Sequence, residues 1–348
     1  MRFSEPRIGL TFDDVLLVPK RSTIRSRSNV SLKTKLSRNI ELEIPVIAAN
    51  MDTVCEKQMA KTMARLGGIG IIHRFLPIEV HAAQVGEVKA EGLLVGAAVG
   101  TDHDMIDRAK ALVAAGCDVL VLDIAHGHAD HSIDGVKRLK DAFPDTDVIA
   151  GNVATRAGAD DLIDAGADAI KVGVGPGGVC TTRLVAGVGV PQLTAIDNVN
   201  GIHVPLIADG GIKTSGDMAK ALAAGGDTVM IGSLLAGTRE SPGEVEQGPN
   251  GLRKRIRGMA SFEAIAARAE RHGDEIDDEY FEQRAAEGVE GTVPYRGDAA
   301  KLINQLLAGV RSAMSYSDAH SLAEFHERAE FIQVTALGYR ENTPHATH

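Results

Sequence analysis

An internal repeat constrains the fold more than any other feature of this sequence. The segments "AAGCDVLVLD", "DAGADAIKVG" and "AAGGDTVMIG" share one pattern: a helix end, a glycine, an aspartate and an apolar run. Glycine closes a helix readily because it adopts the left-handed backbone conformation without strain. A short apolar run is typical of a parallel strand that is buried on both faces. Repeats of this kind predict stacked units of strand and helix.

Eight strands of this type are expected, separated by Ala-rich helical segments such as Ile106–Ala115 and Gly216–Ala224. Eight strand–helix units close most naturally into a (β/α)8 TIM barrel. A doubly wound open sheet is the alternative. Because such barrels often exceed about 250 residues as one unit, we expect residues 1–348 to form a single catalytic domain. The expected strands are Ile44–Met51, Gly67–His73, Leu93–Gly100, Val119–Gly127, Val148–Ala154, Ala169–Gly177, Pro205–Gly211 and Thr228–Gly237.

The composition agrees with a helix-covered parallel sheet and argues against several other classes of protein. Aromatic residues make up 3% of the chain and Trp is absent, so the core must consist mainly of Ala, Val, Ile and Leu. A net charge of -10 argues against nonspecific nucleic-acid binding, which needs a basic surface. No apolar run approaches the roughly 18 residues of a membrane span, and the N-terminus lacks a signal-peptide pattern. We therefore expect a soluble cytoplasmic protein with no membrane partner.

Two segments lie outside the repeat. Met1–Glu41 is polar and rich in β-branched residues, and we expect it to pack across the N-terminal end of the barrel. Thr238–Gly297, called the flap below, follows the eighth strand and has a charged run, an acidic stretch and little strand pattern. Long loops of this kind are often active-site lids, so we predict a mobile flap, with functionless disorder as the alternative. The chain then returns to helices at Ala299–Ser315 and Leu322–Arg328.

The loop after the sixth strand, "GVGPGGVCTTR", is the first candidate for chemistry. Active sites of these barrels form at the C-terminal ends of the strands. Cys180 lies there beside Thr181 and Thr182, so it is the candidate nucleophile. A buried structural cysteine is the alternative, and it is what we expect of Cys55 and Cys117. The three cysteines have neither zinc-ligand spacing nor the number needed for a disulfide framework.

The loops after the seventh and eighth strands predict a phosphate site. Gly210 and Gly211 follow one strand, and Gly232 and Ser233 follow the other. Barrels commonly bind phosphate with these two loops, using backbone N–H groups. Asp209 precedes the first pair and is expected to accept ribose hydroxyls, with helix capping as its alternative role. The pattern indicates a nucleotide ligand.

Two other patterns are less informative. The run "HGHADH", with His126, His128 and His131, could suggest a metal, but no carboxylate group supports that interpretation. No Gly-x-Gly-x-x-Gly fingerprint appears in a strand–helix–strand context, so the sequence does not distinguish NADP from NAD.

Five motifs in order resemble the inosine-monophosphate dehydrogenase / guanosine-monophosphate reductase family. They are "LTFDDVLLVPKRS", "GVGPGGVCTTR", "ADGGI", "GSLLAGTRESPGE" and "AAEGVEGTVPYRG", and they span nearly the whole chain. The regulatory CBS pair that normally interrupts the dehydrogenase barrel after strand 2 is not expected here, because "IIHRFLPIEV" runs straight on. Two positions depart from the family: Gly178 replaces a phosphate-binding Ser, and Ile256 replaces a phosphate-contacting Tyr.

The resemblance implies a covalent thioimidate between the cysteine and C2 of a purine nucleotide. In the dehydrogenase this intermediate forms from IMP by hydride loss to NAD, and water converts it to XMP. In the reductase it forms from GMP by loss of ammonia, and NADPH then reduces it to IMP. The two enzymes therefore differ in whether the site activates water or releases an amine.

Local signatures favour the reductase. "AANMDTV" and "DIAHGHADH" resemble reductases, and the flap reads "DEYF", with Glu279 before Tyr280 where dehydrogenases carry an arginine that activates water. Loss of a positioned base typically costs ~10²–10⁴-fold in rate. In contrast, "GAAVG", "RLVAGVGVPQ" and "RENTPHAT" look more like a dehydrogenase. A CBS-less dehydrogenase would need Arg268, Arg271 or Arg284 to activate water; an idle nucleotide-binding paralogue is the third interpretation.

The resemblance also assigns residues to the reductase reaction. Cys180 would attack C2, while Thr182 and Glu287 would protonate and position the departing amine. Asp123, Ala125 and Asn152 would line the nicotinamide side of an NADPH cofactor, or of NAD in the dehydrogenase. The nucleotide would contact Asp209, Gly210, Gly211, Gly232, Ser233, Gly258 and Met259.

A potassium ion and a homotetramer are implied in the same way. The carbonyl groups of Gly173, Gly175 and Cys180 would hold the ion. Glu341 from a neighbouring subunit would complete its coordination. The expected small-molecule partner is a purine nucleotide, and no nucleic-acid partner is expected.

Overall fold

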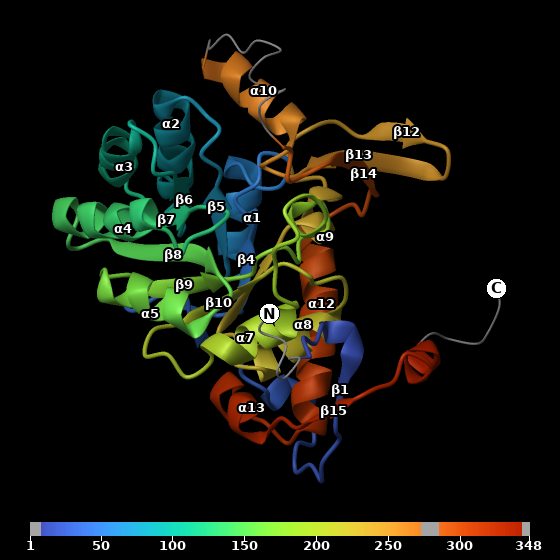
Figure 1. Cartoon of the computed structure of the whole chain (residues 1–348). Coiled ribbons are helices and arrows are strands. Elements are labelled where there is room, and N and C mark those ends of the chain that lie inside the picture. Colours follow the sequence, from blue (N-terminus) through green and yellow to red (C-terminus); the bar gives the residue numbers. More distant parts are fainter. Residues whose placement is uncertain (1–7, 273–284, 343–348) are drawn as a thin grey trace.

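Eight parallel strands close into a barrel, as the repeat predicts. The structure, a computed structural model, describes residues 8–272 and 285–342. Seven of the eight strands are shorter than the sequence suggested because the apolar runs continue into the loops that carry the site. Figure 1 shows the chain as a ribbon. Around the barrel the strands are β10 (Leu206–Asp209), β11 (Thr228–Ile231), β4 (Val46–Ala48), β5 (Ile69–Ile72), β6 (Gly96–Val99), β7 (Val119–Asp123), β8 (Asp147–Val153) and β9 (Ala169–Val172).

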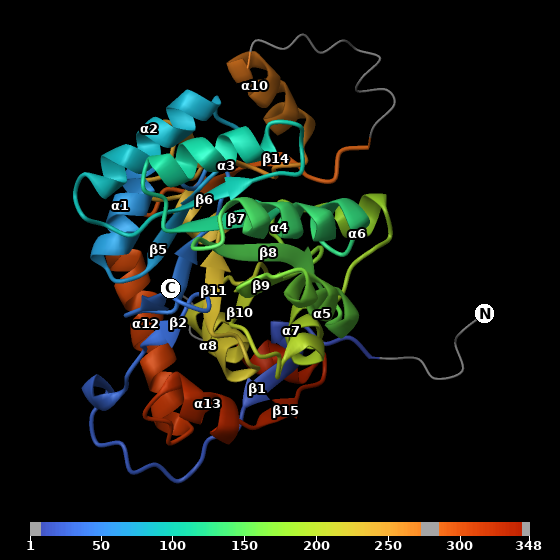
Figure 2. The ribbon, with the colours of Figure 1, turned by 90° about the vertical axis from the view of Figure 1, so that its left-hand side faces the viewer.

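Helices cover the outside of the barrel (Figure 2). The strands face them with Val, Ile, Leu and Ala side chains that are almost wholly buried, in agreement with the aromatic-poor composition. No helix in the described ranges is long and apolar enough to cross a membrane. The covering helices are α1 (Lys57–Arg65), α2 (Ile78–Lys89), α3 (Met105–Ala114), α4 (Asp130–Ala142), α5 (Arg156–Asp164), α7 (Gln192–Val199), α8 (Ser215–Ala223) and α12 (Ala299–Tyr316).

The repeated aspartate fastens neighbouring strands at the N-terminal end of the barrel. In each repeat its backbone N–H donates to a carbonyl at the start of the preceding strand, and its carboxylate accepts the N–H of that same residue. The glycine two residues earlier has a positive φ, of 92°, 106° or 116°, which explains why glycine stands there. The three reciprocal pairs are Asp118 with Val95, Asp168 with Val148 and Asp227 with Leu206.

One part of the N-terminal segment packs across this same end, as predicted, whereas Phe12 and Asp13 lie against Gly211 and Lys213 after β10, at the opposite end of the barrel. Strands β2 (Thr34–Lys35) and β3 (Glu41–Leu42) form a hairpin. Its turn reaches the barrel through Ser37, whose hydroxyl donates to Asp147 Oδ2 at 2.6 Å. The backbone N–H of Arg38 donates to the carbonyl oxygen of Asp168, one of the repeated aspartates, at 3.0 Å.

The end of the chain also follows the prediction. Helix α12 and helix α13 (Leu322–Arg328) occupy the expected helical positions. The sequence did not indicate the short strand β15 (Phe331–Gln333), which pairs antiparallel with β1 (Val15–Leu17). This pairing joins the two ends of the chain.

The flap contradicts the expectation of little strand structure. Strands β12 (Glu246–Gly248), β13 (Gly251–Arg257) and β14 (Glu290–Pro294) form an antiparallel sheet. Helix α10 (Phe262–His272) follows β13. Figure 1 shows all four elements together at one end of the barrel.

A buried lysine explains why the strand pattern was missed. Lys254 and Ile256 alternate with exposed residues along β13, and both are buried. Lys254 Nζ donates to the carbonyl oxygens of Thr238 at 3.0 Å and Ser241 at 2.7 Å. Because a charged residue fills an inward position, the alternation of apolar and polar residues is hidden.

We predict that Asp168→Ala lowers the free energy of unfolding by about 1–3 kcal/mol, the usual cost of an unpaired buried polar group. Its carboxylate accepts the Val148 N–H at 2.9 Å and Lys140 Nζ at 2.8 Å, and both bonds would be lost. Urea denaturation measures the change. The matched control is Asp164→Ala, because Asp164 is exposed near the end of α5. Equal losses in the two variants would contradict the assigned role of the repeat.

Candidate active site

A buried lysine joins the strand ends where the site was predicted. Lys171 on β9 is 2% exposed, and its Nζ donates to Asp123 Oδ1 at 2.8 Å and Asp209 Oδ2 at 2.9 Å. The same nitrogen contacts Asn152 Oδ1, and Asn152 Nδ2 donates to Asp209 Oδ2 at 2.9 Å. The network therefore brings two of the three predicted nicotinamide residues, Asp123 and Asn152, beside the predicted ribose residue Asp209. Sequence reasoning missed Lys171, although a lysine in the apolar run "AIKV" was the available signal.

Opposite charges hold this network in its ionised form. Burial alone would raise the pKa of Asp123, but the positive charges of Lys171 and Arg74 outweigh it and lower that pKa. Burial would also lower the pKa of Lys171, but the carboxylates of Asp123 and Asp209 outweigh it and raise that pKa. These two shifts favour the ammonium form of Lys171 and the carboxylate form of Asp123.

The Cys180 loop is paired with the far end of the flap. Cys180 and Gly288 form an antiparallel β-bridge. Beside this bridge the Thr181 N–H donates to the Glu287 carbonyl oxygen at 2.9 Å. The Glu287 N–H in turn donates to the Ala260 carbonyl oxygen at 3.1 Å. Backbone pairing therefore places the predicted nucleophile and the segment with the predicted acid together.

The side chains of Cys180 and Thr182 are also adjacent. Cys180 Sγ lies 3.3 Å from Thr182 Oγ1, at the start of α6 (Thr182–Val185). Cys180 is half-buried, whereas Cys55 and Cys117 are buried as expected. Burial raises the pKa of Cys117 to about 12, and it raises that of Cys55 as well. The two core cysteines therefore remain thiols, and Cys180 is the accessible one.

One glycine lets the flap approach the Cys180 loop, and a second lets two segments of the flap approach each other. A side-chain carbon at Gly258 would lie 2.9 Å from the Val179 carbonyl oxygen, and one at Gly288 would lie 3.1 Å from Ser261 N. Both distances are shorter than ordinary contacts with a side-chain carbon. Close packing of the backbone, rather than a special backbone conformation, thus explains these glycines.

The predicted phosphate loops meet at the same end of the barrel. Gly210 and Gly211 have φ values of 97° and 80°, which favour glycine. A side-chain carbon at Gly210 would lie 2.9 Å from Pro176 Cγ in the Cys180 loop. A side-chain carbon at Gly178 would lie 2.9 Å from Ser233 Oγ. The loops after β9, β10 and β11 therefore converge.

The first residues after β4 connect these loops with the flap. A side-chain carbon at Gly232 would lie 3.0 Å from Met51 Sδ. The sulfur of Met259 accepts the Asp52 N–H at 3.4 Å. Arg257 Nε lies 3.0 and 3.3 Å from the two oxygens of the buried Asp52 carboxylate. This ion pair, which the sequence did not reveal, attaches β13 to the barrel.

A second ionic contact attaches α10. Arg268 donates to Asp102 Oδ2 at 3.0 Å, and Arg74 donates to the same oxygen at 3.3 Å. The guanidinium carbons of Arg74 and Arg268 lie 5.4 and 5.6 Å from the centre of the Phe75 ring. Arg271 donates to the Phe75 carbonyl at 3.4 Å. Two of the flap arginines considered for water activation are thus engaged in holding the flap.

The groups available to a metal are mainly backbone oxygens. Among the described residues, no three His, Cys, Asp or Glu side chains are grouped to bind a metal ion. At the surface, His128 Nε2 lies 2.7 Å from Asp161 Oδ2. Gly173 and Gly175 have φ values of 150° and 89°, and the Gly173 carbonyl accepts from Asn152 Nδ2 at 2.8 Å. Carbonyl oxygens are suitable ligands for an alkali cation, and each has a second lone pair.

Some predicted residues lie apart from this assembly. Ala125 lies in the loop that follows β7. Glu341 lies on the 3₁₀ turn η3 (Gly338–Asn342), in the red segment that extends away from the barrel in Figure 1. Glu279 and Tyr280 lie outside the described residues.

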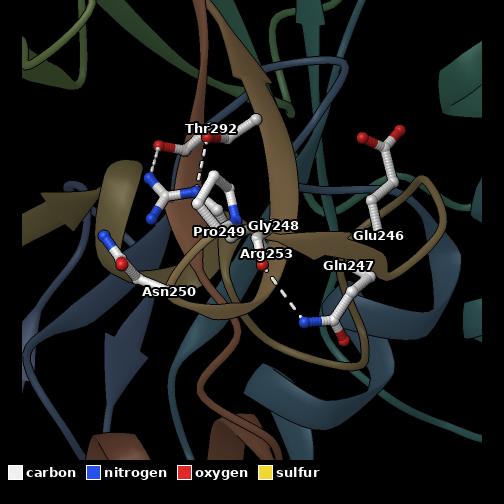
Figure 3. Close-up of a pocket in the computed structure, with 7 residues that line it drawn as sticks. All are labelled: Glu246, Gln247, Gly248, Pro249, Asn250, Arg253 and Thr292. Atoms are coloured by element: carbon white, nitrogen blue, oxygen red, sulfur yellow. Dashed lines mark hydrogen bonds between the residues drawn. The ribbon is translucent and has the colours of Figure 1, made fainter.

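Two surface hollows do not coincide with the predicted site. The larger, about 380 Å³, is on the turn between β12 and β13 (Figure 3), where Arg253 Nε donates to Thr292 Oγ1 at 2.6 Å. The other, about 340 Å³, includes the start of α1. Neither contains a predicted site residue. We place the site at the strand ends, because buried charges and the cysteine meet there.

We predict that Gly258→Ala separates the flap from the Cys180 loop, because a side-chain carbon there would lie 2.9 Å from the Val179 carbonyl oxygen and overpacking of this kind costs about 1–3 kcal/mol. The rate at which iodoacetamide alkylates Cys180 should then rise about fivefold, the effect of roughly 1 kcal/mol on a local equilibrium. Mass spectrometry measures this rate. Gly291→Ala is the control, because a side-chain carbon there has no atom within 4 Å outside its own chain neighbours. Equal rates in the two variants would contradict the pairing.

Comparisons with known proteins identify the family. Residues 9–345 match the family described as "IMP dehydrogenase / GMP reductase domain". An inosine-5'-monophosphate dehydrogenase from Nitrosopumilus maritimus is 39% identical, over 99% of this chain and 99% of that protein. A GMP reductase from Leishmania major is also 39% identical, over 97% of this chain and 96% of that protein.

A solved structure agrees with these relatives. It is a cysteine-to-alanine variant of the GMP reductase from Trypanosoma brucei, in complex with guanosine 5'-monophosphate. The two folds match with a TM-score of 0.93 and 36% identity, over 99% of each chain. A length of 348 residues fits a barrel without the CBS pair. The chain therefore belongs to the IMP dehydrogenase / GMP reductase family of purine-nucleotide oxidoreductases.

Proposed function

We propose that this protein is a GMP reductase, which converts GMP and NADPH into IMP, NADP and ammonia. The relatives do not choose between the two activities, because a dehydrogenase and a reductase are equally similar to the chain. The observation that carries the proposal is the pairing of the Cys180 loop with the segment that contains Glu287, beside Thr182. These groups are the ones that release of an amine requires.

The first step replaces the amine of GMP by sulfur. The Cys180 thiolate adds to C2, a C–S bond forms, and the C2–N bond then breaks as ammonia leaves. Ammonia leaves only after protonation, and Glu287 would supply the proton through the Thr182 hydroxyl. The 3.3 Å separation of Cys180 Sγ and Thr182 Oγ1 supports this relay, because the hydroxyl lies beside the sulfur that would bind C2.

The second step returns the cysteine to its free form. NADPH supplies a hydride to C2, and the electrons of the C–S bond return to Cys180 as IMP forms. Asp123, Ala125 and Asn152 would orient the nicotinamide. The nucleotide would be held through its ribose, phosphate and base by Asp209, Gly210, Gly211, Gly232, Ser233, Gly258 and Met259.

A potassium ion and a homotetramer belong to the same proposal. The carbonyls of Gly173, Gly175 and Cys180 would bind the ion and so fix the shape of the Cys180 loop. Glu341 on η3 would reach this site in a neighbouring subunit. The extension of that segment away from its own barrel is consistent with such an exchange (Figure 1).

The alternative is a CBS-less IMP dehydrogenase, which would oxidise IMP to XMP with NAD. It requires a group that activates water at C2. Arg268 and Arg271 are engaged by Asp102 and by the Phe75 carbonyl. The remaining candidate, Arg284, lies outside the described residues. The engagement of two of the three arginines favours the reductase.

The activity is tested by following reduced nicotinamide in two parallel assays with potassium. Oxidation of NADPH with GMP, accompanied by ammonia release, is the expected result. Steady formation of NADH and XMP from IMP would overturn the proposal in favour of the dehydrogenase.

Cys180→Ala should lower turnover at least about a thousandfold while GMP still binds, because it removes only the nucleophile. Turnover near that of the wild type would contradict the covalent mechanism.

The position of Glu279 gives a further prediction. If this carboxylate marks the loss of water activation, Glu279→Arg should produce XMP from IMP at a rate above the wild-type background. Chromatography of the nucleotide products measures this gain, and Glu279→Gln is the control for simple loss of the charge. No difference between the two variants would remove Glu279 from the argument.

A further inference from the structure

The structure assigns to Lys171 the role of a positioning residue that holds the nucleotide-binding and cofactor-binding carboxylates in one fixed relation. Its Nζ lies 2.8 Å from Asp123 Oδ1 and 2.9 Å from Asp209 Oδ2. This inference rests on the proposed function, in which Asp209 holds the ribose of the nucleotide and Asp123 faces the nicotinamide.

Charge and burial require a cation at this position. The side chains of Asp123 and Asp209 are 22% and 21% exposed, and two carboxylates that share such a half-buried site repel each other and lose part of the solvation that water would provide. Asn152 Nδ2 donates one hydrogen bond to Asp209, but the neutral amide does not offset the negative charge of the two carboxylates. Arg74 also attracts Asp123, yet it donates its hydrogen bond to Asp102. Within the described ranges, Lys171 is the one cation with hydrogen bonds to both Asp123 and Asp209.

Lys171 acts through these carboxylates rather than on the ligands. Its side chain is 2% exposed, so a ligand at the strand ends meets the carboxylates and not the ammonium group. The lysine comes from β9, between β8, which carries Asn152, and β10, which carries Asp209. A shift of its Nζ would therefore move groups on both sides of the site. Hydride transfer depends on this spacing, because misplacement of reacting atoms by about 1 Å can cost about 100-fold in rate.

The test compares Lys171→Met, Lys171→Arg and the control Lys140→Met. Lys140 also pairs with a buried carboxylate, that of Asp168 at 2.8 Å, but at the opposite end of the barrel. Lys171→Met should lower kcat/KM for GMP and for NADPH by about 10–100-fold, the usual effect of losing a group that orients ligand-binding residues. Lys171→Arg should restore both values to within about threefold, because it keeps the charge and the donors. Lys140→Met should lower only the melting temperature.

Each outcome decides the inference. Values of kcat/KM for Lys171→Met within about threefold of the wild type would overturn it, because about 0.65 kcal/mol is too little for a shared counter-ion. Equal activity losses in Lys171→Arg and Lys171→Met would also overturn it, since charge would then be irrelevant. Lys171→Gln is measured in parallel because it keeps an N–H donor, and it is judged by the same limits if Lys171→Met does not fold.

A double-mutant cycle tests the claim that Lys171 acts through Asp123. In the Asp123→Ala background, Lys171→Met should add little to the KM for NADPH, whereas its effect on the KM for GMP should persist through Asp209. Full additivity on the KM for NADPH would contradict that route.

Failure of this inference can be distinguished from failure of the proposed function. The wild-type assays decide the reaction, whereas the inference depends on the ratio of variant to wild type in whichever reaction occurs. If the wild type is inactive in both assays, isothermal titration calorimetry with GMP is used instead. Weaker GMP binding by Lys171→Met, with Lys171→Arg and Lys140→Met unchanged, would support the role of Lys171. Equal affinities in all variants would overturn it.

Discussion

One buried ammonium group connects the ends of four barrel strands. Lys171 on β9 contacts the carboxylates of Asp123 on β7 and Asp209 on β10, and the side-chain amide of Asn152 on β8. Removing such a cation from water is costly unless its partners are fixed around it. The geometry of the strand ends is therefore set by electrostatics as well as by packing. Every ligand contact proposed for Asp123 or Asp209 depends on that arrangement.

The two ends of the barrel use polar groups for different purposes. At the N-terminal end, backbone N–H groups donate to all three repeated aspartates and lysines donate to two of them, so these bonds stabilise the strands. At the C-terminal end, glycines let backbone segments from three loops and the flap approach one another. The pairing of Cys180 with Gly288 is the main result of that approach. Stability and chemistry are thus separated along the barrel axis, as is usual for this fold.

The sequence predicted the parts of this structure that depend on local patterns. The barrel strands, the helices that cover them and the glycine–aspartate repeat each have a sequence signature within about ten residues, so they could be predicted. The flap sheet could not, because Lys254 fills an inward position and hides the alternation. The Cys180–Gly288 bridge could not either, since it joins residues far apart in the chain through backbone atoms that every residue shares. Lys171 was visible as an anomaly, but its partners become neighbours only when the barrel closes.

The flap arginines illustrate how tertiary contacts bear on the choice between the two proposed chemistries. Arg257 is committed to Asp52, and Arg268 shares Asp102 with Arg74, so these guanidinium groups bind the flap to the barrel. A guanidinium held by a carboxylate is stabilised as a cation and is a poor base for water. A dehydrogenase on this scaffold would have to break one of these contacts or use an arginine from elsewhere. The proposed reductase would instead need an acid near Cys180, and the backbone pairing brings the Glu287 segment to the Cys180 loop.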